Sequence, residues 1–382
     1  MSCCIPRERQ PIAELRVDGD FENGRIDVVS IDQEQKVITT RVPEDDHTQN
    51  PQMRFWQMRV TGLVPGEQVT IRHTPSVEMH YVYSYDGESW RRFADPGIDH
   101  LSCRFEEREV FIAPNIPYTY TRSVQLADDL TGNPFVTVSD LTQSEEGRAV
   151  KLLRITDDSI GEQEKRVLWI QGRQHAFESP SSFPPEGFAR WMASDDVEAA
   201  EFRKRVVAYV VPMMDVDNVF HGKSGKDMPH DFNRSWQEVP CPWHAIAATK
   251  NKLTALKKQG VSFVGFVDSH DPYFVQGPQW YVAGTSESWR HFGQHFVAGV
   301  ARAGGLNRHG MAVESMLSAP PANTQRSRDF AWSLFQETPD FLALTLESPH
   351  YQDSDGKFMT EQGYLQWGEA LGRAFFHYLS VS

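Results

Sequence analysis

The stretch Arg166-Val-Leu-Trp-Ile170 runs directly into Gln171-Gly-Arg-Gln-His-Ala-Phe-Glu178. After its opening arginine the first half is apolar and has the length of a buried strand, whereas the polar, glycine-containing second half is typical of a loop. The loop places His175 three residues before Glu178, a spacing that only one of the 14 histidines has. An imidazole and a carboxylate at the end of a strand offer a nitrogen and an oxygen ligand to a small cation.

Three later apolar runs end on polar residues in the same way. They are Val206–Pro212, before a loop containing Pro229-His-Asp-Phe-Asn-Arg-Ser-Trp236; Ser262–Val267, before Asp268-Ser-His270; and Phe341–Leu346, before Glu347. The segments at 197–205, 243–258, 286–303 and 361–380 have the pattern of helices. Apolar strands that alternate with helices predict an α/β domain, whose mostly parallel sheet is covered by helices on both faces.

The polar residues at these strand ends are expected to meet, because ligands of such sheets bind beyond the carboxyl ends of the strands. We predict that His175, Glu178 and His270 bind one zinc ion per chain, and that Glu347 stays free as a base. A catalytic zinc uses such ligands and keeps its fourth position for water. Taken singly, each residue also fits an ordinary polar strand end, so the prediction depends on the ordered set.

With this order of motifs the sequence resembles the M14 zinc carboxypeptidases, and among them the cytosolic carboxypeptidase branch, whose eukaryotic members trim glutamates from protein tails. The matching motifs are His175 with Glu178, Asp231 with Asn233 and Arg234, then His270, and finally Glu347. Further likeness to that branch lies in Gly147-Arg148, Phe21-Glu-Asn-Gly-Arg-Ile26 and Pro117-Tyr-Thr-Tyr120. Each piece is weak alone, but the combination is specific and extends over nearly the whole chain.

The resemblance implies a role for each matched residue. Glu347 is the expected general base, which takes a proton from the zinc-activated water and returns it to the leaving amine. Asp231 is expected to orient a zinc-bound imidazole. Arg234, with Asn233 beside it, is expected to bind the substrate's terminal carboxylate, since a guanidinium presents a planar fork of donors. The implied activity is hydrolysis of the C-terminal amide bond of a peptide or protein tail.

One loop departs from the family pattern. The family usually has an arginine here that helps zinc to stabilise the oxyanion, but Phe220-His-Gly-Lys-Ser-Gly-Lys-Asp-Met228 contains none. Lys226, or less readily Lys223, is the expected substitute, as a single ammonium rather than a planar fork. An oxyanion donor commonly contributes about 3 kcal/mol to stabilising the transition state, so the departure bears on full activity.

The substrate's last side chain is expected to be read by a residue between His270 and Glu347. Arginines in this interval, any of which could line a pocket for glutamate or aspartate, are Arg290, Arg302, Arg308, Arg326 and Arg328. Exposure at the surface is nevertheless the default for an arginine.

The N-terminal part of the chain has a different pattern. Its short, aromatic and β-branched runs are Phe55–Gly62, Gln68–Arg72, His80–Ser84 and Glu109–Ala113, separated by turn signals such as Asp86-Gly87. Such runs predict an antiparallel β-sandwich, which could dock substrate or support assembly. We therefore expect a sandwich domain at residues 1–138 and the α/β/α mixed-sheet catalytic domain at 139–382.

Composition is that of a globular enzyme: 382 residues, 40% hydrophobic and 24% charged. The net charge of −14 disfavours nucleic acid as a partner. No apolar run is long enough to cross a membrane, and the first residues lack the apolar core of a signal peptide. Four scattered cysteines do not form a disulfide framework, so we expect a cytoplasmic protein. The sequence does not indicate an oligomeric state.

Other functional classes stay open from the sequence. A zinc amidase or deacylase acting on a small conjugate or a cell-wall peptide could use the same metal and glutamate. A catalytically impaired relative could bind peptide C-termini without turning them over, because the oxyanion arginine is missing. The presence of Glu347 argues against the latter, since binding alone does not require a base.

Overall fold

The computed structural model of this chain describes residues 14–44, 55–74, 80–94, 100–161, 165–225, 230–271, 279–283, 326–352 and 356–381. The chain divides into two compact units, an N-terminal unit of residues 1–44 and 56–114 and a C-terminal unit of residues 45–55 and 115–382. The expected boundary at 138/139 falls inside strand β10 (Val136–Gln143) of the C-terminal unit. Helix α1 (Tyr120–Leu130), which packs on that unit's strands, likewise precedes the expected boundary.

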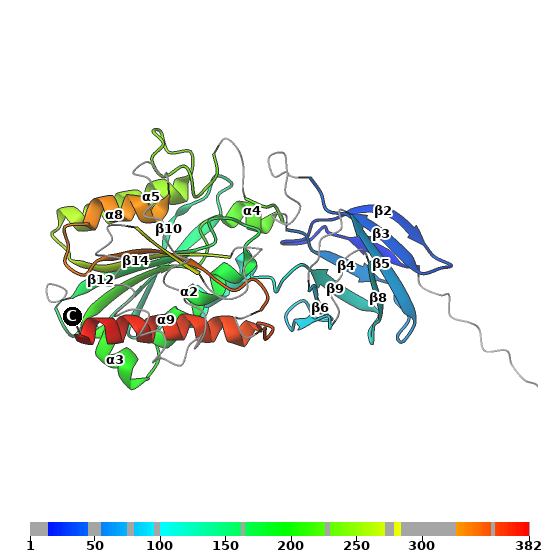
Figure 1. The fold of residues 1–382 in the computed structure, drawn as a ribbon, viewed down its shortest axis with the longest axis horizontal. Coiled ribbons are helices and arrows are strands. Elements are labelled where there is room, and N and C mark those ends of the chain that lie inside the picture. Colours follow the sequence, from blue (N-terminus) through cyan, green and yellow to red (C-terminus); the bar gives the residue numbers. More distant parts are fainter. Residues whose placement is uncertain are drawn as a thin grey trace, which may run out of the picture. The chain divides into compact units, whose positions relative to one another are not determined.

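The described part of the N-terminal unit contains two β-sheets, with strand orders β1-β4-β9-β6-β7 and β2-β3-β5-β8 (Figure 1). The strands are β1 (Arg16–Asp18), β2 (Asp27–Asp32), β3 (Val37–Arg41), β4 (Met58–Thr61), β5 (Gln68–Thr74), β6 (Val82–Ser84), β7 (Arg91–Arg92), β8 (His100–Arg104) and β9 (Glu109–Ala113). Alternating side chains of both sheets, such as Ile38 and Ile71 from one and Val60 and Ile112 from the other, share one apolar core. The expectation of a purely antiparallel arrangement is wrong in one place, because β3 pairs with β5 in parallel.

The C-terminal unit is built on a seven-stranded mixed sheet with the order β10-β11-β13-β12-β14-β16-β15. Its further strands are β11 (Ala149–Ile155), β12 (Arg166–Gly172), β13 (Val206–Val211), β14 (Phe263–His270), β15 (Gln279–Ala283) and β16 (Leu342–Glu347). The four central strands are parallel. On one side β11 pairs antiparallel with both β13 and β10, and on the other side β15 pairs antiparallel with β16. The predicted mixed α/β fold is thereby confirmed.

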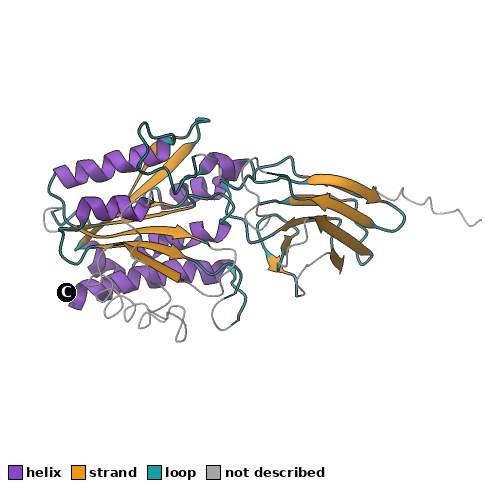
Figure 2. Ribbon diagram, turned by 45° about the horizontal axis from the view of Figure 1, so that its top comes forward, coloured by secondary structure: helices purple, strands orange, loops and turns teal. Residues whose placement is uncertain are grey.

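Helices cover both faces of this sheet (Figures 1 and 2). Besides α1, the described helices of this unit are α2 (Phe183–Met192), α3 (Val197–Arg203), α4 (Val216–Phe220), α5 (His244–Lys258), α8 (Ser327–Phe335) and α9 (Glu361–Val381), with the 3-10 helix η3 (Ser179–Ser182) before α2. Helices α5 and α8 lie on one face, and α2, α3 and α9 on the other. Helices α2 and α9 approach closely at Gly187, where an added Cβ would meet the Leu365 carbonyl oxygen at 2.0 Å.

Most of the expected strands and helices of this unit are present within a few residues of their predicted limits. The helix expected at 286–303 lies outside the described residues. Among the residues that are described, no helix combines the length and apolar character needed to cross a membrane.

The strand register decides which residues meet at the carboxyl edge of the sheet. Strand β14 lies between β12 and β16, and in parallel pairing Gln171 is opposite Asp268 while His270 is opposite Glu347. Residues from three separate parts of the sequence are therefore adjacent at this edge.

Candidate active site

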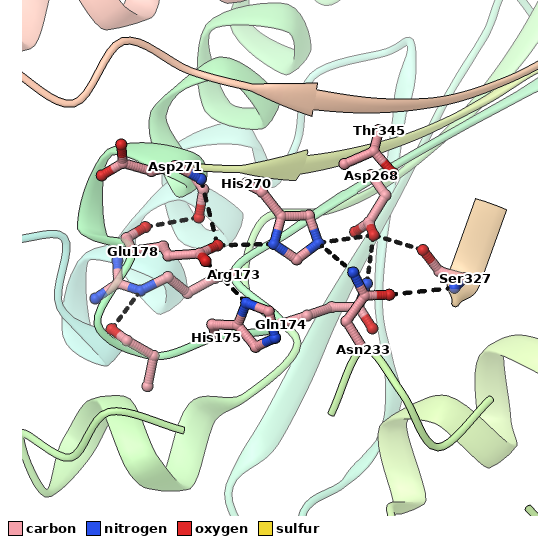
Figure 3. A network of polar contacts seen from close by, with 12 residues as sticks. Arg173, Gln174, His175, Glu178, Asn233, Asp268, His270, Asp271, Ser327 and Thr345 are labelled. Atoms are coloured by element: carbon pink, nitrogen blue, oxygen red, sulfur yellow. Dashed lines mark hydrogen bonds and ion pairs between the residues drawn. The ribbon is translucent and has the colours of Figure 1, made fainter. Parts of the chain in front are cut away.

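Three buried side chains, His175, Glu178 and His270, converge at the carboxyl ends of β12 and β14 (Figure 3). Glu178 lies between the two imidazoles, with Oε1 2.8 Å from His175 Nδ1 and Oε2 2.7 Å from His270 Nδ1. One ligand atom from each residue lies within 4.8 Å of the others, so that one metal ion could bind all three. The structure brings together the whole ligand set predicted from the sequence, and its two nitrogens and one carboxylate suit zinc.

The loop that carries two of these residues is held by Arg173. This residue follows β12 with a φ of 61°, in the left-handed region, which turns the chain out of the strand. Its buried Nε donates to the Ala176 carbonyl oxygen at 2.8 Å, and a terminal nitrogen donates to those of Ser179 at 3.0 Å and Tyr118 at 3.3 Å. Burial lowers the pKa of Arg173 to about 9. Nothing in the local sequence marks Arg173, because one arginine in a polar loop carries no specific signal.

Charge in the metal-free site is divided between Glu178 and His270. Burial by itself would raise the pKa of Glu178, but the imidazoles of His175 and His270 outweigh it and hold that pKa well below its ordinary value. Burial would lower the pKa of His270, but the carboxylates of Asp268 and Glu178 raise it well above its ordinary value. A divalent cation would take the place of the proton on His270, because metal ligands bind deprotonated.

Each imidazole has a second carboxylate at its outer nitrogen. His175 Nε2 lies 3.1 Å from Asp231 Oδ1, and His270 Nε2 lies 2.8 Å from Asp268 Oδ2. With a metal ion on the two Nδ1 atoms, the Nε2–H groups would donate to these carboxylates, the arrangement that fixes the orientation of metal-binding histidines. The sequence predicts Asp231 in this place but not Asp268. The spacing of Asp268 and His270 could have indicated it, since residues two apart on a strand share one face of the sheet.

Asp268 connects His270 to two other parts of the site (Figure 3). It is fully buried and accepts hydrogen bonds from Gln174 Nε2 at 2.5 Å, Ser327 Oγ at 2.5 Å and Gln171 Nε2 at 3.3 Å. Burial alone would raise the pKa of Asp268, but His270 and these donors lower it. The carboxylate therefore stays ionised and joins the loop after β12, the end of β14 and the start of α8.

Glu347 ends β16 directly opposite His270. Burial raises the pKa of Glu347 to about 7, with His270 opposing this shift and Glu178 and Asp271 adding to it. A carboxyl group that titrates near neutrality can both accept and return a proton at physiological pH. The position of Glu347 at the carboxyl edge, beside the three candidate ligands, is the one expected from the sequence.

Asn233, followed directly by Arg234, lies next to the candidate ligand His270. Asn233 is buried, its Nδ2 lies 3.0 Å from His270 Nε2, and its Oδ1 accepts from the Ser327 backbone N–H at 3.2 Å. Arg234 is partly exposed, and one terminal nitrogen donates to the Asn233 carbonyl oxygen at 3.0 Å. No carboxylate among the described residues forms an ion pair with Arg234. Of the two, Arg234 is the residue with donors left for a ligand.

Further arginines gather at the start of α8. Arg328 is 2% exposed, donates to Thr345 Oγ1 at 3.0 Å, and lies 3.6 Å from a carboxylate oxygen of Asp329. Burial lowers the pKa of both Arg326 and Arg328, and the charge of Arg234 lowers that of Arg326 further. Like charges held in a desolvated region favour binding of an anion.

Some candidates cannot be compared with the structure. Lys226, the expected oxyanion donor, lies outside the described residues, as do Arg290, Arg302 and Arg308. Lys223 is described and exposed, and its backbone N–H donates to the Asn218 carbonyl oxygen at 2.8 Å.

Comparison with known proteins confirms the resemblance seen in the sequence. The zinc carboxypeptidase family Peptidase_M14 matches residues 124–251. Mouse cytosolic carboxypeptidase 6 is 36% identical over 164 residues, which is 40% of this chain and 30% of that protein. Mouse cytosolic carboxypeptidase 2 is 32% identical over 162 residues, which is 39% of this chain and 18% of that protein. The matched region thus spans less than a third of either relative.

Solved structures extend the likeness in fold to nearly the whole chain. A metallo-carboxypeptidase from Pseudomonas aeruginosa, in complex with (2-guanidinoethylmercapto)succinic acid, is similar with a TM-score of 0.79 and 22% identity, covering 96% of this chain and 99% of that one. A metallo-carboxypeptidase from Burkholderia cenocepacia has a TM-score of 0.78 and 21% identity, with the same coverage. At these identities the similarity establishes the fold.

Proposed function

We propose that this chain, which carries a zinc carboxypeptidase domain of the M14 family, is a metallocarboxypeptidase that removes the last residue of a peptide or protein tail. The observation that carries the proposal is the pairing of His270 with Glu347 across neighbouring strands, beside His175 and Glu178. It puts a candidate base next to a candidate metal site.

In this proposal His175, Glu178 and His270 hold one zinc ion, and Asp231 and Asp268 keep the two imidazoles in their binding orientation. Bound zinc supplies a Lewis acid that activates water and polarises the scissile carbonyl. Glu347 accepts a proton from the attacking water and returns it to the leaving amine. Its pKa of about 7 supports this role.

Arg234 would restrict cleavage to the chain end by binding the terminal carboxylate, with Asn233 beside it. Its support is a partly exposed guanidinium for which the described residues offer no carboxylate. A planar fork of donors suits a carboxylate better than a single ammonium does. Lys226 would serve the oxyanion in place of the family's arginine.

In this proposal the preferred substrate is a peptide whose last residue has an acidic side chain. Arg328 would read it, because it is buried, its only ion pair among the described residues is a long one of 3.6 Å from its Nε to Asp329, and that Nε makes no hydrogen bond. A buried guanidinium with a single long ion pair gains from a closer anion. Arg326 nearby would add to the attraction.

The two units would have separate roles. We assign the chemistry to the C-terminal unit, and interpret the N-terminal unit as a β-sandwich domain because residues of both of its sheets share one core. We also place the protein in the cytoplasm, in keeping with the names of its cytosolic relatives. A nucleic-acid or membrane partner is not part of the proposal.

The test is a set of peptides that differ only in their last residue (glutamate, aspartate, leucine or lysine), incubated with zinc-loaded protein, chelator-treated protein and Glu347→Gln. We expect release of a single C-terminal residue that requires zinc and falls at least about 10²-fold in kcat in Glu347→Gln, the usual scale for a general base. Cleavage only of small amides would favour the amidase. Zinc and peptide binding with no turnover in the unaltered protein would favour a binding protein.

A further inference from the structure

The Glu347 carboxylate is not held by its own hydrogen bonds. Among the described residues no hydrogen bond or ion pair reaches it, whereas Glu178 is bonded to two imidazoles. The direction of an unbonded side chain is set by its backbone and by the packing around it. What fixes the backbone on either side of Glu347 therefore decides where the base lies relative to the metal site.

On its N-terminal side Glu347 is fixed by the sheet, because β16 pairs with β14 and β15 up to this residue. On its C-terminal side the chain leaves the sheet through Ser348, whose N–H donates to the His270 carbonyl oxygen at 2.8 Å. Beyond that bond the strand pairing ends. The turn after Glu347 needs other contacts to keep one conformation.

Those contacts converge on His350. Its Nδ1 lies 2.8 Å from Asp271 Oδ2, and the two residues are 4% and 0% exposed. Its carbonyl oxygen accepts from the Tyr364 hydroxyl at 2.6 Å and from Asn115 Nδ2. The ring and the backbone of one residue are thus held from three directions, by the segment after β14, by α9 and by the segment before α1.

The partner of the His350 ring lies next to the candidate metal site. Asp271 directly follows the candidate ligand His270, and its backbone N–H lies 3.3 Å from Glu178 Oε2. The bond between Asp271 and His350 therefore joins the turn of the base to the segment that holds the metal ligands. Because a chain of only a few hydrogen bonds connects the turn after Glu347 to the candidate metal ligands, the distance between them is nearly fixed.

We propose that His350 is a positioning residue for Glu347, which through Asp271 sets the distance and direction of the base relative to the metal. This inference rests on the proposed function, since it assumes that Glu347 is the base. A bond whose only effect was on folding could be replaced by apolar packing of similar volume with little loss of activity. A positioning bond cannot, because a displacement of about 1 Å at a reacting group can lower the rate by about 10²-fold.

The variants that separate these roles are His350→Ala and His350→Asn. The side-chain amide nitrogen of asparagine can take the place of Nδ1 and donate to Asp271, while alanine offers no donor. We expect His350→Ala to keep its zinc and its KM within about threefold but to lose about 10–100-fold in kcat, and His350→Asn to recover most of the loss. His221→Ala is the matched control, because His221 Nε2 pairs with Glu146 at 2.7 Å with both side chains exposed.

The inference is overturned if His350→Ala keeps its kcat, if His350→Asn is as impaired as His350→Ala, or if His350→Ala loses zinc. Crystal structures of the zinc-loaded proteins give a readout that needs no activity. We expect the turn after Glu347 and the Glu347 carboxylate to move in His350→Ala and to stay in place in His350→Asn. An unmoved carboxylate in His350→Ala would contradict the inference, even if the unaltered protein cleaved no peptide and the proposed function had failed on its own test.

Discussion

His270 and Glu347 lie opposite each other in the parallel pairing of β14 and β16. One is a candidate zinc ligand and the other the candidate base, and the hydrogen bonds between two central strands set their separation. Parallel strands that are buried on both faces are among the most rigid parts of a domain. The proposed chemistry therefore rests on the sheet itself, with loops supplying His175, Glu178 and Arg234.

The carboxylate of Asp268 should tune the affinity for zinc. In Asp268→Asn the acceptor for His270 Nε2–H is neutral, so we expect zinc affinity to fall about 10–100-fold, the usual effect of losing a carboxylate behind a ligand histidine. Competition with a chromogenic chelator measures this. Asp140→Asn, which removes an exposed partner of Lys151, is the control. Equal zinc affinity of Asp268→Asn and the unaltered protein would contradict this role.

Zinc binding should release protons and weaken at low pH. In the metal-free protein burial would lower the pKa of His270, but Asp268 and Glu178 raise it well above its ordinary value, so a proton must leave before zinc binds. We expect affinity to fall steadily from pH 8 to pH 6. Titration calorimetry in two buffers of different ionisation enthalpy gives the number of protons released. Identical apparent enthalpies in both buffers would show that none leaves.

Glu347→Gln should stabilise the metal-free protein at pH 8. The folded pKa of Glu347 is about 7, above its ordinary value of 4.5, because burial disfavours the charged form. The folded state then binds more protons than the unfolded state between these two values, so the contribution of Glu347 to stability falls as pH rises from about 4.5 to 7. Above pH 7 the buried carboxylate is ionised, which lowers the free energy of unfolding by on the order of 1–3 kcal/mol. Glutamine is uncharged and does not have this cost.

Denaturant unfolding of the two metal-free proteins at pH 8 and at pH 5 measures the effect. The difference in free energy of unfolding between Glu347→Gln and the unaltered protein should be largest at pH 8 and shrink at pH 5. A pH-independent difference would mean that burial does not disfavour the ionised carboxylate.

Arg234 should make cleavage depend on a free C-terminus. A peptide with an amidated end offers no charge to the guanidinium, and we expect it to lose on the order of 2–3 kcal/mol of transition-state stabilisation, as for a charge-assisted hydrogen bond. Arg234→Ala should discriminate far less between free and amidated ends. The comparison is made on kcat/KM for one peptide in both forms. Equal cleavage of both by the unaltered enzyme would favour the amidase.

Arg328 should set the preference for an acidic last residue. Arg328→Met keeps a flexible, unbranched side chain but removes the charge, so we expect the ratio of kcat/KM for C-terminal glutamate over leucine to fall about 10–100-fold, chiefly through slower cleavage of the glutamate peptide. A parallel fall for both peptides would point to a structural role at Thr345.

The sequence alone could predict the strands and the residues that end them. Buried strands such as Val206–Val211 are apolar throughout, so their limits and the polar residues that follow are local features. His175, Glu178, His270 and Glu347 were found in this way, and the structure brings them together. The order of the motifs added the resemblance to zinc carboxypeptidases, whose family model matches residues 124–251.

Other features depend on which distant segments become neighbours. The roles of Asp268 and His350 follow from contacts with Ser327 and Asp271, and nothing in the local sequence marks those contacts. The parallel pairing of β3 with β5 and the place of β10 in the larger sheet are of the same kind.

Hydrophobic periodicity is a property of neighbouring residues, so the sequence by itself determined the elements of this protein and the residues at their ends. Strand order and register are properties of the packed chain, because they depend on which faces are buried together. Only the tertiary structure could decide that His270 is opposite Glu347, that Asp268 lies 2.8 Å from the outer nitrogen of His270, and that His350 pairs with Asp271 beside the turn after Glu347.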